Sequence, residues 1–96
     1  MGRNAEALEY GKQFLVVQRE RLAANPEEVE EIRFFADSVN LVKAINIKLG
    51  NKADACALAT EMEIAFERRD KVTEIALGPY EENIRAENIA FLEACD

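Results

Sequence analysis

Hydrophobic residues recur along the chain at the three- and four-residue spacing of α-helices, and glycine and proline divide this pattern into segments. The spacing predicts helices over residues 4–24, 27–49, 51–77 and 79–94. No window alternates β-branched and polar residues in the way that a half-buried strand does. The sequence therefore predicts an all-α fold in which residues 1–96 form one domain, an antiparallel bundle of four helices.

Specific residues mark where the predicted helices begin and end. Asn25 is expected to cap the second helix, with Pro26 at the first helical position, where no backbone N–H is needed. Gly50 is expected to end this helix in the left-handed conformation, and Asn51 to cap the third. Pro79 separates the third helix from the fourth.

The second predicted helix is apolar over more than half of its circumference. Its apolar residues form two adjoining stripes, one of Ile32, Phe35, Val39, Val42 and Leu49 and the other of Phe34, Leu41 and Ile45. Such a helix must be covered on two sides, so we expect it at the centre of the fold. Because a chain this small does not cover both stripes with much to spare, we also expect a homo-oligomer, such as a homodimer.

The opposite side of the second helix carries a row of mostly polar residues. These are Arg33, Asp37, Asn40, Ala44 and Ile47. Ile47 is a large apolar side chain in a polar setting, which is typical of the centre of an interface. We therefore expect this row to bind a peptide or a helix of a partner protein. The alternative is that the first or the fourth helix covers Ile47.

Asn46 is a polar residue within the apolar arc of the second helix, between Val42 and Leu49. A buried amide without a hydrogen-bond partner costs about 1–3 kcal/mol, so Asn46 should have a partner. We expect either another Asn46 across a two-fold axis, where the pair would fix the oligomeric state, or a backbone carbonyl inside the fold.

The composition excludes several kinds of active site. The 96 residues include no histidine, which removes the commonest general base, the usual catalytic triads and most zinc and di-iron sites. The glycines stand singly, so no glycine-rich loop is present to cradle a phosphate. The sequence therefore predicts a protein that is not an enzyme and that holds no metal or cofactor.

The chain is acidic, with 19 acidic and 12 basic side chains and a net charge of −7. Within residues 72–96, six carboxylates stand against a single cation, Arg85. This excess argues against nucleic-acid binding at that end. It also suggests an alternative function, an acidic helical inhibitor of phage-like size that occupies the basic site of a nucleic-acid-binding protein.

The two cysteines, Cys56 and Cys95, belong to no recognisable framework or CxxC pair. We expect free thiols in a reducing compartment, with a disulfide or a reactive thiol as the alternative. The first residues lack the apolar stretch of a signal peptide, and no run approaches the roughly 18 apolar residues of a membrane span. The sequence therefore predicts a soluble, cytoplasmic protein without membrane contact.

Residues 5–66 resemble a tetratricopeptide repeat array of the long-loop variety found in signalling proteins. The resemblance rests on Ala7-Leu8-Glu9-Tyr10, on Asn25-Pro26, on Arg33, Ala36, Ser38 and Asn40, on Leu49-Gly50-Asn51 and on Ala55. Lys43, Asn46 and Gly11 depart from the family pattern, which commonly has glycine, a large aromatic residue, and Tyr or Phe there.

This resemblance implies a protein-binding scaffold without catalysis. Residues 4–24 would be the second helix of one repeat, residues 27–49 and 51–77 the next pair, and the last helix a cap. The row from Arg33 to Ile47 would then line the concave groove that receives a peptide or helix. Any antiparallel helical hairpin with small residues at the crossing gives similar spacing, so an unrelated hairpin is the alternative.

Overall fold

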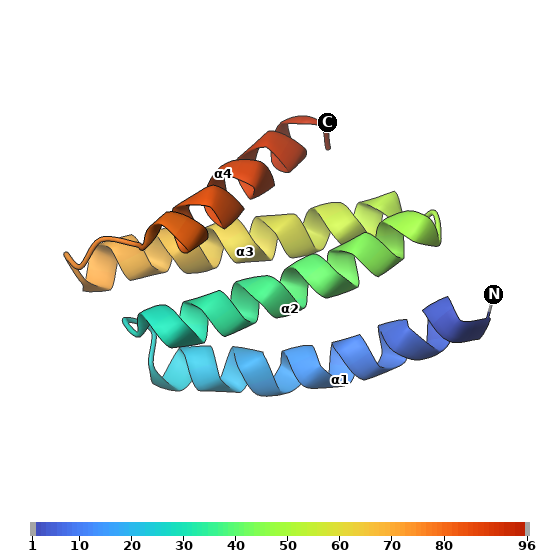
Figure 1. Cartoon of the computed structure of the whole chain (residues 1–96), viewed down its shortest axis with the longest axis horizontal. Helices are drawn as coiled ribbons and strands as arrows, with labels where there is room; N and C mark the ends of the chain where they lie inside the picture. The colour runs from blue at the N-terminus through green and yellow to red at the C-terminus, as the bar shows by residue number, and fades with distance from the viewer. Residues whose placement is uncertain (1, 96) are drawn as a thin grey trace.

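Residues 2–95, which the computed structural model describes, form four α-helices joined by short connections (Figure 1). The helices are α1 (Gly2–Ala24), α2 (Val29–Lys48), α3 (Lys52–Val72) and α4 (Pro79–Glu93). No strand occurs in this part of the chain. The prediction of an all-α bundle of four helices is confirmed.

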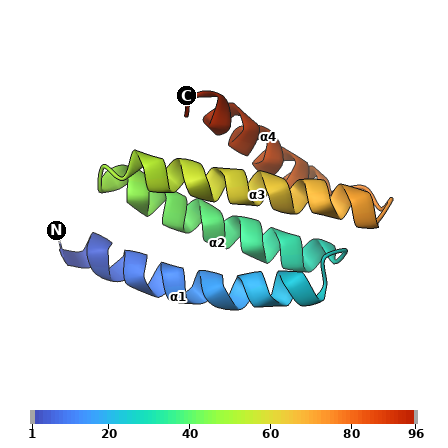
Figure 2. The same cartoon turned by 180° about the vertical axis from the view of Figure 1, so that it is seen from behind.

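The helices pack in chain order, with α2 between α1 and α3, and α4 against α3. In Figure 1, α2 and α4 lie nearer the viewer than α3, and Figure 2, drawn from behind, shows α3 in front of both. Helices α1 and α4 lie at opposite edges in both views. The bundle is therefore open, and the predicted central place of the second helix is confirmed.

The core is one cluster of apolar side chains centred on α2. Its buried members are Leu15, Ile32, Phe35, Ala36, Val39, Val42, Met62, Phe66 and Ile84. Leu8 and Leu22, which share heptad spacing with Leu15, pack against its edge. The core stripe of α2 is buried as predicted from Ile32 to Val42, because α1 and α3 cover it from both sides. Leu49, the last residue of the predicted stripe, is exposed, because it lies just beyond the end of α2.

The start of α2 differs from the prediction. Asn25 closes α1, since its backbone N–H donates to the carbonyls of Arg21 and Leu22 at 3.1 Å each. Its side-chain amide also donates to the Arg21 carbonyl, at 3.4 Å. Asn25 therefore does not cap α2, which begins at Val29 after a turn that includes Pro26. Asn25 bonds to the free carbonyls at the end of α1 and not to the free N–H groups at the start of α2.

The end of α3 was also predicted wrongly, because the helix stops at Val72 and not at residue 77. Thr73 is extended, with φ −149° and ψ 149°, and its hydroxyl accepts the Ile75 N–H at 3.2 Å. Arg69 donates from Nη1 to the Ile75 carbonyl at 2.9 Å. These two bonds satisfy backbone groups outside the helix, so the apolar residues beyond Val72 need not extend it.

The predicted stop and start signals at Gly50 and Pro79 are confirmed. Gly50 has a φ of +81°, and Pro79 is the first residue of α4. Asn51 stands at the start of α3 as predicted, but its side chain makes no hydrogen bond to the helix.

The expectation of free thiols was wrong, because Cys56 and Cys95 form a disulfide with a Cα–Cα distance of 5.9 Å. Cys56 lies in the first turns of α3 and Cys95 just follows α4. The antiparallel α3–α4 hairpin brings these distant residues together, which sequence spacing alone does not reveal. No helix within residues 2–95 is both long enough and apolar enough to cross a bilayer.

Candidate protein-binding surfaces

The five residues predicted to bind a partner lie on one side of α2, and we refer to them as the α2 strip. Ile47 is 48% exposed, so neither α1 nor α4 covers it. Asp37 and Ala44 are also exposed, whereas Arg33 and Asn40 are half-buried. The α2 strip is therefore open along most of its length, with an apolar side chain at its C-terminal end.

The N-terminal end of the α2 strip is joined to α4 by one hydrogen bond. The Tyr80 hydroxyl donates to Asp37 Oδ1 at 2.8 Å. This bond raises the pKa of Tyr80 above its ordinary value, because the phenolate would lose the bond and face the Asp37 charge. Arg33 stacks its guanidinium over the neighbouring Phe34 ring, 5.5 Å from the centroid. A polar side-chain contact with α4 thus holds this end of the α2 strip.

The side chain of Lys43, a residue of α2, lies between α2 and α4. Its Nζ donates to Asn88 Oδ1 at 3.3 Å and lies 4.6 Å from the centre of the Phe91 ring. Burial lowers the pKa of Lys43, and the Glu87 charge opposes this shift. The ammonium group therefore forms part of the contact between the two helices and is not a free cation for a ligand.

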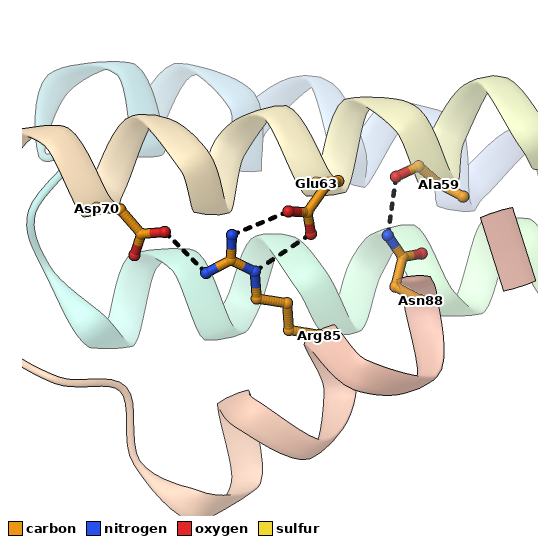
Figure 3. A network of polar contacts seen from close by, with 5 residues as sticks. All are labelled: Ala59, Glu63, Asp70, Arg85 and Asn88. Atoms are coloured by element: carbon orange, nitrogen blue, oxygen red, sulfur yellow. Dashed lines mark hydrogen bonds and ion pairs between the residues drawn. The ribbon is translucent and has the colours of Figure 1, made fainter. Parts of the chain in front are cut away.

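The position of α4 is set by polar contacts to α3 (Figure 3). Arg85 donates to Glu63 from Nε at 3.2 Å and from Nη2 at 2.9 Å, and to Asp70 from Nη1 at 2.9 Å. Asn88 donates from Nδ2 to the Ala59 carbonyl at 2.8 Å. The bond to Glu63 is the main cause that raises the pKa of Arg85. A bidentate pair of this kind fixes orientation as well as distance, so α4 is held in one place beside the strip.

Asn46 has neither of the two partners that the sequence suggested. Its side chain is buried, at 2% exposure, and its Oδ1 accepts a hydrogen bond from Asn51 Nδ2 at 3.3 Å. The Asn51 backbone N–H also donates to the Asn46 carbonyl, at 2.8 Å. Asn46 thus fastens the turn between α2 and α3. Because the amide is enclosed by its own chain, the predicted Asn46 pair across a two-fold axis is wrong.

The second apolar stripe of α2 is only partly covered. Ile45 is buried, but Phe34 and Leu41 are exposed. Phe34 and Leu41 therefore form an open apolar surface on α2, and the sequence predicts self-association from such a surface.

Sequence reasoning missed a hollow on another side of the molecule, between α1 and α3. Its larger part has a volume of about 780 Å³ and its smaller part about 390 Å³, and Arg19 and Glu61 line both. We refer to the two parts together as the α1–α3 groove. Ile64 and Val72 of the larger part are large apolar side chains, and both are exposed. Both lie off the buried stripe of α3, which includes Met62 and Phe66, so only the packing of the helices decides that a hollow forms beside them.

A further hollow of about 640 Å³ lies where α3 leads into α4. Arg69 lines it, is 2% exposed, and has no hydrogen-bond partner for Nε and Nη2 among the described residues. The other charged residues around it are Asp70, Glu74, Glu82 and Arg85, so its lining is acidic on balance. Within residues 2–95, no cluster of three or more Cys, Asp or Glu is placed to hold a metal ion.

The comparisons with known proteins add no assignment to this geometry. No family model, no curated protein and no solved structure matches the chain at a significant level. The tetratricopeptide resemblance therefore stays a prediction, and a function can be inferred only from the surfaces described above.

Proposed function

We propose that this protein is a non-catalytic interaction module, an adaptor that binds a peptide or a helix of a partner protein through the α2 strip. The observation that carries the proposal is the 48% exposure of Ile47 at the open end of a polar row. An exposed apolar anchor with polar neighbours is the usual arrangement at the centre of a binding surface.

The arrangement of the helices supports this proposal. Helices α2 and α4 face the same side of the molecule, with α3 behind them (Figures 1 and 2). In a tetratricopeptide-like array, the first helices of successive pairs line the groove in this way. The bonds from Arg85 and Asn88 to α3 would keep α4 in place while a ligand binds, which lowers the entropic cost of association.

Self-association is a second part of the proposal. The exposed Phe34 and Leu41 offer an apolar surface on α2 that a second copy would cover. Multi-angle light scattering of the wild type and of Leu41→Glu tests it, because a homodimer held by this surface should become monomeric in the variant.

The proposed compartment is the cytoplasm, as the sequence suggested. The disulfide weighs against this compartment, since disulfides persist mainly in oxidising compartments.

A photo-crosslinking experiment tests binding at the α2 strip. A photoreactive amino acid replaces Ala44, which is exposed beside the anchor, and crosslinked products from the native lysate are identified by mass spectrometry. The proposal expects a defined partner whose capture is lost when Ile47→Asp is added. Val17→Asp, at an exposed apolar residue on α1 that lines none of the hollows described above, is the matched control and should leave capture unchanged. Capture that survives Ile47→Asp would contradict the proposal.

The alternative function is electrostatic mimicry by the C-terminal acidic residues. Glu82, Glu87 and Glu93 are exposed on α4, and Arg85 is occupied by carboxylates of α3. Salt discriminates between the two functions, because an electrostatic mimic should lose affinity steeply as ionic strength rises. Binding centred on Ile47 should change much less.

A further inference from the structure

The α1–α3 groove has an apolar floor and walls supplied by three helices. Phe35 of α2 lies at the floor of the larger part, Leu22 of α1 forms one wall, and Ile64 of α3 forms the other. Along α3 this part extends from Glu61 to Val72, which corresponds to about 17 Å or three helical turns. Its volume of about 780 Å³ is large enough to accept several apolar side chains.

The charges on the rim of the larger part are positive on balance. Arg19 is neutralised by Glu61 through bonds of 2.6 and 2.8 Å that join α1 to α3. Arg68 and Lys71 are exposed, and neither forms an ion pair within the part of the chain that the structure describes. The larger part therefore has two unpaired cations on its rim, although the whole chain has a net charge of −7.

We propose that the larger part of the α1–α3 groove is a second docking site, for an amphipathic helix with an acidic flank on a partner protein. The apolar side of that helix, with residues at i, i+4 and i+7, would lie between Leu22 and Ile64 over Phe35. Its acidic flank would pair with Arg68 and Lys71. A helix placed opposite α2 would complete a closed four-helix arrangement around the α1–α2–α3 core.

Charge complementarity decides the choice of occupant. A basic helix would be attracted by the overall charge but repelled by the two cations on the rim. A second copy of this chain would bring a further net charge of −7, and the buried Ile84 and Asn88 show that α4, its most acidic helix, already packs on its own α3. An amphipathic acidic helix of another protein matches the cationic rim with its charge, the apolar floor with its apolar side, and the three-turn length of the groove.

The proposal goes beyond the proposed function, because it gives the molecule a second binding surface formed by other residues. With the α2 strip occupied by one partner and the α1–α3 groove by another, the protein would bridge the two. Failure of either site leaves the other unaffected, so the two proposals are tested separately.

The test uses synthetic helical peptides and the full chain. One peptide carries three leucines at i, i+4 and i+7 with flanking glutamates, a second has lysines in place of the glutamates, and a third has serines in place of the leucines. Fluorescence anisotropy at low salt should show the glutamate peptide binding at least about tenfold more tightly than either of the others, against the overall charge of the protein.

The variants assign this binding to the groove. Ile64→Glu should abolish it, and the double variant Arg68→Glu with Lys71→Glu should reverse the preference toward the lysine peptide. Ile47→Glu on the α2 strip is the matched control and should bind the glutamate peptide like the wild type. Circular dichroism and thermal unfolding confirm that each variant is folded, which is expected because all four positions are exposed.

Several results would overturn the proposal. These are equal binding of the glutamate and lysine peptides, binding that Ile64→Glu leaves intact, or absence of binding up to about 1 mM peptide. A wild-type dimer that Ile64→Glu dissociates would also overturn it, because the groove would then hold a second copy.

Discussion

A Cβ atom at Gly11 would lie 2.8 Å from Cγ2 of Val42, so α1 approaches α2 more closely here than any side chain at position 11 would allow. Val42 is buried in the core, and its branched side chain has little freedom to move away. Gly11 stands in the middle of α1, where glycine lowers helix stability. The close approach explains why it is nevertheless present.

We expect Gly11→Ala to lower the free energy of unfolding by about 1–2 kcal/mol. Overpacking a core costs about 1–3 kcal/mol, and the helix gains about 0.5–1 kcal/mol when alanine replaces glycine. Urea denaturation monitored by circular dichroism measures the change. In a Val42→Ala background the clash is gone, so Gly11→Ala should become stabilising there. The same destabilisation in both backgrounds would show that the 2.8 Å contact is not the cause.

Reduction of the disulfide should lower the free energy of unfolding by about 4 kcal/mol, from the entropy of a loop of 39 residues in the unfolded chain. Thermal unfolding with and without dithiothreitol measures the loss. The double variant Cys56→Ser with Cys95→Ser should match the reduced wild type and should not respond to reductant. Identical unfolding of the oxidised and reduced wild type would contradict the prediction.

The two carboxylates that bind Arg85 should differ in importance. Glu63 is 18% exposed and accepts two hydrogen bonds from Arg85, whereas Asp70 is 52% exposed and accepts one. We expect Glu63→Gln to cost about 1–3 kcal/mol and Asp70→Asn less than about 1 kcal/mol, since solvent screens the exposed pair. Chemical denaturation of both single variants gives the comparison, and equal losses would mean that burial does not decide the strength of these bonds.

Lys43 should make stability increase with pH in the alkaline range. Its pKa in the folded chain is below 10.5, the ordinary value that holds in the unfolded chain. Between these two pKa values the unfolded chain binds more protons, so the folded state gains stability as pH rises toward 10.5. Lys43→Met should remove this gain, which urea midpoints measured from neutral pH to 10.5 would reveal.

Tyr80 should make the free energy of unfolding fall as pH rises in the alkaline range, opposite to Lys43, so its contribution has to be eliminated from the Lys43 measurement. Its pKa in the folded chain is above 10.0, so the stability it contributes is present below 10.0 and is lost as pH rises through the higher value. The Lys43 measurement therefore uses a Tyr80→Phe background. A pH dependence there that Lys43→Met does not change would contradict the assignment.

Part of the candidate site was visible in the sequence. The row from Arg33 to Ile47 follows the helical period, so its residues share a side of α2 wherever that helix lies. The periodicity also located the core stripe from Ile32 to Val42, because α2 is apolar enough to need cover on both sides. The α1–α3 groove was not visible, because helices far apart in the sequence supply its walls and helical spacing does not specify how they pack.

Local interactions explain why the helices themselves were predictable. Helical periodicity, the left-handed Gly50 and the position of Pro79 depend on residues a few places apart, so the sequence by itself determined the number, order and type of the elements. The errors at Asn25 and Thr73 also have local causes. Asn25 bonds back to carbonyls of α1 and so does not cap α2, and the Thr73 hydroxyl accepts the Ile75 N–H beyond α3.

The tertiary structure alone decided which distant residues meet. The pairing of Cys56 with Cys95, the bond from Arg85 to Glu63 and the fit of Gly11 against Val42 depend on how the helices pack. Packing adjusts many side chains at once, and helical spacing specifies only which of them share a face. The sequence thus determined the helices and their apolar sides, and the packing determined which surfaces remain open for a partner.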